Sequence, residues 1–377
     1  MKITHVEIKN FKNLQDKAIE LDGRSVVFAG NNAIGKTNTI LAIYWCLTGS
    51  LLDNTTDNEN LFRHFTNDPV CVLVKFDTGL TISRQLEIAD DGKVVTNITV
   101  NGKSYGAKKA ESVIDYELGL GVVALKDTKA IKVRRLLLNP LYINYIGNKD
   151  LRDYFSSLLG LDTLPKNTFD KLPEIEQRAL KEYLTDYYDV ADIAKKIKAA
   201  KTESEKKQQF WTVVCEYLNE YQKLNETEIA NAQKNRDDAA TKVLSFAQSE
   251  NAIKDYVNEL TKAYDVSFKE ITGLNVKFIQ ETKTTDSYEL VFTPIIDNKG
   301  TELSNGSTSE QVRYCVEFIA AIRKAFNLPE LPIIVDETET FDAKNFVKIT
   351  ESANAQLITA RVESWGDNFI HQAFLNE

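Results

Sequence analysis

The chain divides into three stretches by the pattern of its hydrophobic and polar residues. Residues 1 to about 160 hold apolar runs of strand length, among them KITHVEI, SVVFAG and VCVLVKF. Later runs are separated by Thr78-Gly79, Asp91-Gly92 and Asn101-Gly102, dipeptides typical of hairpin turns. We therefore predict an antiparallel sheet attached to a core in which SVVFAG leads into a helix from Thr37.

The middle stretch is predicted to be almost entirely helical. It has no glycine between Gly160 and Gly273 and no proline between Pro173 and Pro294. Apolar residues recur at spacings of three and four, as in Phe210, Val213, Val214, Tyr217, Leu218, Tyr221 and Leu224. At least two antiparallel helices follow, with the turn at 225–226 or at 235–238. The many aromatic residues favour a compact helical lobe or stubby hairpin over a thin coiled coil.

Strand-like runs return after Gly273. LNVKFIQ and SYELVFTPII come first, a helix is expected from about Ser309, and LPIIVDE and AQLITA read as buried core strands. The α/β stretches therefore flank the helices. We predict one discontinuous α/β domain, 1–162 and 270–377, interrupted by a helical insertion at 163–269.

Composition narrows the functional classes. No run of about 20 uncharged apolar residues is present and the N-terminus lacks a signal-peptide core, so we expect a cytoplasmic protein without membrane contact. Four scattered cysteines and three histidines suggest neither a zinc site nor a disulfide framework. The net charge of −9 argues against an extended nucleic-acid-binding surface. Two basic segments, 126–135 and 194–201, could each contact phosphates or form a solvated helix face.

The strongest chemical signal is GNNAIGKT, Gly30 to Thr37, between a predicted strand and a predicted helix. It satisfies G-x-x-x-x-G-K-[ST], the P-loop pattern. Such a loop wraps phosphates with backbone N–H groups, while Lys36 would reach the β and γ phosphates and the Thr37 hydroxyl would bind Mg²⁺. The candidate nucleotide contacts here are Gly30, Asn31, Asn32, Ala33, Ile34, Gly35, Lys36, Thr37 and Asn38.

Two further segments fit a nucleotide site. PIIVDE ends an apolar strand in Asp336 and Glu337, which suit a Mg²⁺ ligand and a group that activates water. LSNGSTSEQ, residues 303–311, opens a predicted helix about 30 residues earlier. Ser304, Gly306 and the amides at the helix start could bind an anion, although such a segment alone is more often a helix cap.

In this order, GNNAIGKT, LSNG and PIIVDETETFD resemble the ABC ATPase heads of the SMC, RecF and SbcC group. IKNFKNL, LTISR and the segment 139–161 are similar to other parts of those heads. The resemblance implies an ABC-type P-loop ATPase head, with a mixed core sheet and an antiparallel lobe, and a helical insertion of RecF size. It also implies ATP and Mg²⁺ as cofactors and an ATP-dependent homodimer.

In that family the signature loop of one protomer caps the ATP held by its partner. Ser304, Asn305 and Gly306 would thus act in trans, with Glu337 as the base and Asp342 near the dimer seam. The resemblance places a basic residue, here Lys12, beside the nucleotide. It places the Q-loop Mg²⁺ contact at Asn139 in place of glutamine, and Ala360 or Arg361 where a switch histidine is usual.

By this resemblance we expect a dimerising clamp ATPase that acts on DNA in recombination, repair or replication. An alternative is a regulatory or defence module that controls a separate nuclease or effector protein. A transporter ATPase subunit shares the motifs but normally lacks so long a helical insertion.

Overall fold

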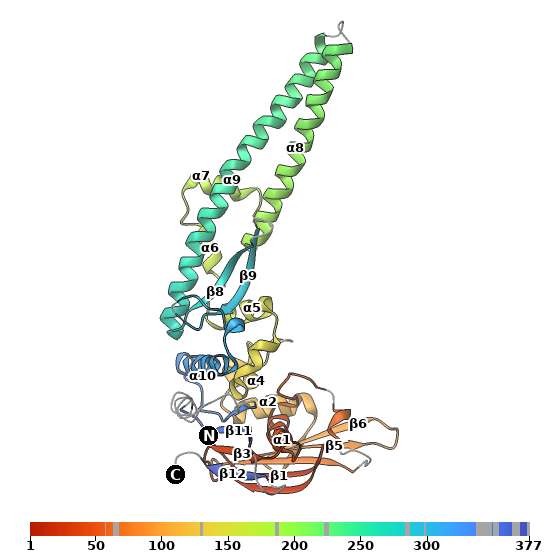
Figure 1. Ribbon diagram of the computed structural model, residues 1–377, viewed down its shortest axis with the longest axis vertical. Coiled ribbons are helices and arrows are strands. Elements are labelled where there is room, and N and C mark those ends of the chain that lie inside the picture. The colour runs from red at the N-terminus through yellow and green to blue at the C-terminus, as the bar shows by residue number, and fades with distance from the viewer. Residues whose placement is uncertain are drawn as a thin grey trace. The chain divides into compact units, whose positions relative to one another are not determined.

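The structure, a computed structural model, describes residues 1–56, 58–62, 68–128, 131–184, 188–221, 226–282, 287–297, 299–336, 349, 354–363 and 370–374. It has two compact units, each described by itself below (Figure 1). The head unit comprises 1–154, 271–275 and 294–377, and the arm unit comprises 155–270 and 276–293.

The head unit contains a six-stranded antiparallel sheet in the order β2-β1-β4-β5-β6-β7. Its strands are β1 (Ile3–Phe11), β2 (Leu14–Glu20), β4 (Val70–Phe76), β5 (Thr81–Ile88), β6 (Val94–Val100) and β7 (Lys103–Tyr105). Alternate residues Val70, Val72 and Val74 of β4 are fully buried, as expected for a strand with one face on a core. The predicted antiparallel sheet is confirmed.

A second sheet of the head unit has the order β10-β11-β3-β12. Its strands are β3 (Val26–Gly30), β10 (Ile333–Val335), β11 (Leu357–Val362) and β12 (His371–Phe374). The first three are parallel, and β12 runs antiparallel to β3. Both neighbours of β3 thus come from residues 357–374, and β12 was not predicted from the sequence.

The buried side chain of Gln356 fastens this sheet to β1. Its Oε1 accepts a hydrogen bond from the Ile3 N–H at 2.6 Å, and its Nε2 donates to the Ile3 carbonyl at 2.9 Å. Backbone groups of β1 and the start of β11 are therefore paired through one amide, which satisfies polar atoms that burial would otherwise leave without water.

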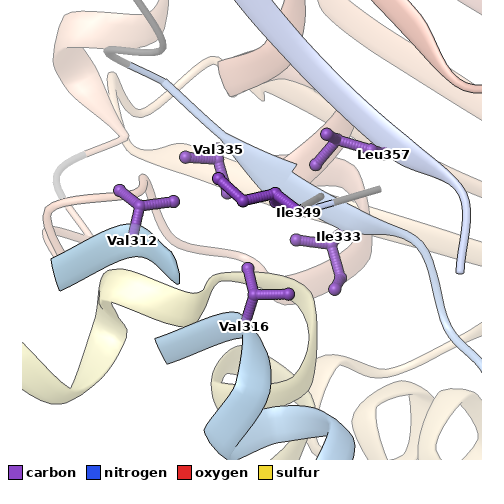
Figure 2. Close-up of a cluster of buried hydrophobic side chains, with 6 residues drawn as sticks. All are labelled: Val312, Val316, Ile333, Val335, Ile349 and Leu357. Atoms are coloured by element: carbon purple, nitrogen blue, oxygen red, sulfur yellow. The ribbon is translucent and has the colours of Figure 1, made fainter. Parts of the chain in front are cut away.

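Helices of the head unit are α1 (Lys36–Thr48), α2 (Ala107–Glu117), α3 (Gly121–Ala124), α4 (Val133–Leu138) and α10 (Thr308–Ala325), with 3-10 turns η1 (Glu59–Leu61), η2 (Pro140–Tyr145) and η3 (Leu303–Asn305). Figure 2 shows how α10 is fixed: Val312 and Val316 point toward the side chains of Ile333 and Val335 on β10. The start of α10 and the end of β10 therefore belong to one rigid packing unit.

The arm unit contains α6 (Leu164–Phe169), α7 (Glu174–Lys181), α8 (Val190–Tyr221) and nearly all of α9 (Glu226–Thr272), while α5 (Asn148–Leu158) crosses the boundary. β8 (Val276–Thr282) pairs with β9 (Ser287–Pro294) in a two-stranded sheet. The sequence pattern assigns these strand runs to the head. They fall in the arm unit because aromatic rings hold them there: Phe278 stacks on Tyr264 and Phe292 on Phe155, with ring centroids 4.4 and 4.5 Å apart.

α8 and α9 run side by side as a long antiparallel pair (Figure 1), joined by an ion pair of 2.8 Å between Lys201 and Glu250. Buried side chains on α9 recur every seven residues, at Ala232, Ala239, Phe246, Ile253 and Leu260, the repeat of a coiled-coil seam. Of the two expected forms, a compact lobe or a hairpin, the helices thus form a hairpin, and it is long (Figure 1). The candidate turn at 235–238 is wrong because it lies inside α9, and residue 225 of the other candidate turn lies outside the described residues.

Among the described residues, no helix combines the length and apolar character required to cross a bilayer.

Candidate nucleotide-binding site

The P-loop follows the buried strand β3 and ends at the first turn of α1, as predicted. Three of its residues have positive φ: Gly30 at 148°, Ala33 at 65° and Gly35 at 102°. A Cβ at Gly35 would lie 2.6 Å from the Leu14 Cδ2 atom, so the loop has no room for a side chain there. When left- and right-handed backbone conformations alternate, successive N–H groups point to the same side. Such a loop forms a concave anion site.

Lys36 lies across this loop. Its side chain is buried, and Nζ donates a hydrogen bond of 2.5 Å to the carbonyl of Asn31. Thr37, the next residue, is exposed, as are Asn32 and Ala33 at the crest of the loop. The Lys36 ammonium inside the loop and the Thr37 hydroxyl at its edge suit a phosphate chain with a bound cation.

The turn between β1 and β2 supports the P-loop from outside, a contact that sequence reasoning missed. The Asn13 side chain donates to the Ala33 carbonyl at 3.2 Å and accepts from the Asn38 amide at 2.7 Å. Lys12 precedes it with a φ of 52°, is partly buried, and donates its backbone N–H to the Leu61 carbonyl. The predicted nucleotide contact at Lys12 therefore lies on a turn that contacts the P-loop. The Phe11-Lys12-Asn13 segment was the sequence feature from which the Asn13 contact could have been predicted.

Asp336 directly follows β10 and is partly buried. In the sheet, Val335 pairs with Thr359, which in turn pairs with Val27 of the P-loop strand. Because the carboxyl ends of parallel strands share one edge of a sheet, Asp336 and the P-loop lie on the same edge, with Asp336 two strand spacings, or ~10 Å, from the P-loop strand β3. Glu337 and Asp342 lie outside the described residues.

Ser304 and Asn305 are exposed, while Leu303 anchors their turn in the core. A Cβ at Gly306 would lie 2.7 Å from the Ile296 Cδ1 atom, so glycine permits the close approach of two segments. The helix cap is Ser307, which forms a capping box with Glu310. Hydrogen bonds from Ser307 lower the pKa of Glu310, so a carboxylate already occupies part of the helix start where an anion was expected.

Asn139, the predicted Q-loop residue, is buried, and its side-chain amide bonds to backbone groups. Its side chain is 2 % exposed, its amide nitrogen donates to the Leu52 carbonyl at 2.9 Å and its oxygen accepts from the Leu141 N–H at 3.1 Å. These bonds cap η2. The residue is thus a buried cap of η2 in this structure, and the Mg²⁺ contact at Asn139 stays a prediction.

Arg361 stands on β11 opposite Ala29, next to the P-loop strand, and its Nε lies 3.6 Å from a Glu363 carboxylate oxygen. Glu363 in turn donates its N–H to the Gly30 carbonyl at 3.0 Å. Ala360, the other candidate, is buried. His371 of β12 pairs with the opposite side of Ala29, which was missed together with its strand.

The first basic segment is partly interior. The side chains of Arg84 and Arg134 are 5 % and 7 % exposed and both bind the carboxylate of Glu111. Burial alone would raise the pKa of Glu111, but the two guanidinium groups hold it below its usual value. Neither predicted alternative, phosphate contact or solvated face, applies to Arg134. In the second segment, Lys201 is paired with Glu250.

The comparisons with known proteins agree with this arrangement. A family model described as an AAA domain, AAA_23, matches residues 5–269. The DNA replication and repair protein RecF of Streptococcus pneumoniae is 30% identical over 203 residues, 50% of this chain and 51% of that protein. RecF of Clostridium botulinum is 27% identical over 188 residues, 46% of this chain and 48% of that protein. The chain thus spans about half the length of the curated relatives it matches.

Among solved structures, a SmcHead bound to the C-winged helix domain of ScpA has a TM-score of 0.39 at 16% identity, covering 100% of this chain and 98% of that one. The recombination mediator protein RecF with ATP has a TM-score of 0.40 at 11% identity, covering 98% and 99%. With the P-loop, Asp336 and the parallel sheet in place, and the family model matching most of its length, the chain belongs to the AAA_23 family of AAA domains.

Proposed function

We propose that this protein is an ATP-dependent dimerising ATPase that acts on DNA in recombination, repair or replication. The observation that carries the ATP site is the built P-loop: a left-handed cradle at Ala33 and Gly35, closed by the buried Lys36. The expectation of a DNA-related role rests on the likeness to RecF proteins over half of the chain.

The residues present suit ATP with Mg²⁺. Gly35 supplies the left-handed backbone that closes the cradle, packed against Leu14 of the β1–β2 hairpin, and Thr37 is exposed two residues later. Mg²⁺ would neutralise charge on the phosphates, held by Thr37 and Asp336. Glu337 would orient or deprotonate the attacking water, and Lys36 would exchange its bond to Asn31 for phosphate oxygens.

A second protomer would complete the site. Ser304 and Asn305 are exposed on a turn that Leu303 and the Ser307 cap hold in place. An exposed, rigid turn of this kind can contact a nucleotide bound to a partner, whereas a buried one could not. Asp342 would lie near the same seam, and the Arg361 guanidinium could respond to the γ phosphate.

The decisive experiment is complementation in trans. Lys36→Ala disables the P-loop and Ser304→Arg blocks the signature turn, so each variant alone should lack ATPase activity. In a mixed dimer one composite site is intact, and an equal mixture should recover about a quarter of the wild-type rate. Recovery of no activity would contradict composite sites formed in trans.

A variant that retains ATP gives an independent check. Glu337→Gln should bind ATP with Mg²⁺ and accumulate as a dimer in gel filtration, while the wild type returns to monomer after hydrolysis. A monomer under these conditions would contradict the clamp. Stimulation of wild-type ATPase activity by duplex DNA would support the DNA role, and its absence would favour control of a separate nuclease or effector.

A further inference from the structure

Helix α8 carries two apolar faces, and only one of them faces α9. Cys215 is buried and Trp211 and Leu218 are partly buried along the seam of the two-helix arm. Phe210, Val213 and Tyr217 belong to the other face and are 60, 63 and 54% exposed. Phe210 is one of the aromatic residues that had suggested a compact lobe.

The exposed residues lie on one line along the helix. Lys206, Phe210, Val213, Tyr217 and Glu220 follow at spacings of four, three, four and three, and we name this set the outer stripe. Residues at such spacings share a face, and the stripe spans about 21 Å. A solvated helix face is normally polar. Three consecutive large apolar side chains on it instead repeat the pattern of a helix-packing seam.

The charges at the ends of the outer stripe indicate what covers it. Lys206 and Glu220 are both exposed and stand seven residues on either side of Val213. In an antiparallel pair of two α8 helices with its two-fold axis at Val213, each Lys206 lies opposite a Glu220 and each Phe210 beside a Tyr217. A parallel pair would set Lys206 against Lys206 and Glu220 against Glu220, which is repulsive.

We propose that the outer stripe is a self-association surface, through which α8 of one molecule pairs antiparallel with α8 of a second copy. The contact is isologous, because the same patch serves both molecules. It involves no nucleotide and no residue of the P-loop. It is therefore separate from the ATP-dependent dimer proposed above.

The test uses the full chain with Lys36→Ala and without nucleotide, so that failure of the ATP-dependent dimer cannot affect the result. Sedimentation equilibrium should show a concentration-dependent dimer. Val213→Glu should raise the dimer dissociation constant at least about tenfold, because it sets two like charges on the axis. Leu244→Glu is the matched control: Leu244 is 75% exposed on α9 but lies off the stripe, and its replacement should change nothing.

Charge reversal tests the orientation. Lys206→Glu alone and Glu220→Lys alone should each weaken the dimer, and the double variant should restore it. As a direct measure, Phe210→Cys and Tyr217→Cys proteins, both with Cys71→Ser, should cross-link to each other when mixed and oxidised. Cross-linking of Phe210→Cys to itself alone would overturn the antiparallel arrangement, and a monomer at all concentrations would overturn the proposal.

Discussion

The side-chain amide of Asn13 donates a hydrogen bond of 3.2 Å to the main-chain carbonyl of Ala33, the non-glycine residue of the P-loop with left-handed backbone. Left-handed backbone is unfavourable for alanine by roughly 1–2 kcal/mol. Asn38 also binds Asn13, so one amide from the β1–β2 turn joins the loop to the first turn of α1. Asn13 is therefore a positioning residue that holds the cradle in shape before ligand binding.

Asn13→Ala should weaken ATP binding about fivefold to tenfold, because a net hydrogen bond contributes ~1 kcal/mol. Calorimetric titration with a non-hydrolysable ATP analogue measures it. Asn10→Ala is the matched control, since Asn10 also has positive φ near this turn but donates to the Pro69 carbonyl. If both variants weakened ATP binding equally, the cause would be a general disturbance of the β1–β2 hairpin and not the loss of the bond to Ala33.

Gly35→Ala should destabilise the protein more than Gly79→Ala. Both glycines have positive φ, 102° and 84°, so both substitutions carry the left-handed penalty of roughly 1–2 kcal/mol. A new Cβ meets Leu14 at Gly35 but nothing within 4 Å at Gly79. Overpacking should therefore add ~1–3 kcal/mol at Gly35. Urea unfolding of the two variants checks the difference, and equal loss would contradict the close approach of Leu14 to Gly35.

Lys36→Ala should reduce ATP affinity by at least ~100-fold, since charge-assisted bonds to phosphate contribute about 1.5–3 kcal/mol each. Filter binding of labelled ATP is a suitable assay. Lys93→Ala serves as the control because the Lys93 side chain is 81% exposed and pairs with Asp91 on a hairpin turn. Retention of ATP by the Lys36 variant would mean that the loop amides alone hold the phosphates.

A pH-dependent effect is expected at Asp127. Burial raises the pKa of Asp127 to about 6. The hydrogen bond from the Val133 N–H favours the charged form and lowers the pKa, but by less than burial raises it. The folded state therefore binds this proton more tightly than the unfolded state does. The associated stability is present below the ordinary carboxyl pKa near 4 and is lost as the pH rises through about 6.

Asp127→Asn keeps an oxygen acceptor for Val133 without the charge. Compared with wild type, this variant should be more stable by about 1–2 kcal/mol at pH 7.5, with allowance for solvent screening, and by no more than about half as much at pH 4.5. Urea unfolding at both pH values measures the change. The same difference at both values would exclude titration of Asp127 as its cause.

Local patterns were sufficient for the P-loop, since the strand, the glycines and Lys36 are contiguous in sequence. The strand before Asp336 was predicted equally well, because a short apolar run is the pattern of a buried strand. Asn13 was missed because its role depends on a contact with a loop 20 residues away. The core strand β12 was missed because HQAF has little apolar alternation, and its partner β3 lies over 340 residues earlier.

The helical stretch shows the opposite limitation. Its helices followed from composition and spacing, but aromatic residues such as Phe210 and Trp211 suggested a compact lobe. Spacing identifies which residues share a face, and it does not say whether that face meets the same chain, another chain or water. The strands β8 and β9, expected with the head, group with the arm unit, where their rings stack on Tyr264 and Phe155, contacts that local spacing does not reveal.

The position of β3 between β11 and β12 has a consequence for biosynthesis. The strand that carries the P-loop is made early, yet both of its hydrogen-bonding neighbours are made only when residues 357–374 emerge from the ribosome. Until then its main-chain groups lack their sheet partners, and Gln356 has not yet joined Ile3. A nascent chain should therefore complete the sheet around the P-loop strand late, only after residues 357–374 have been made.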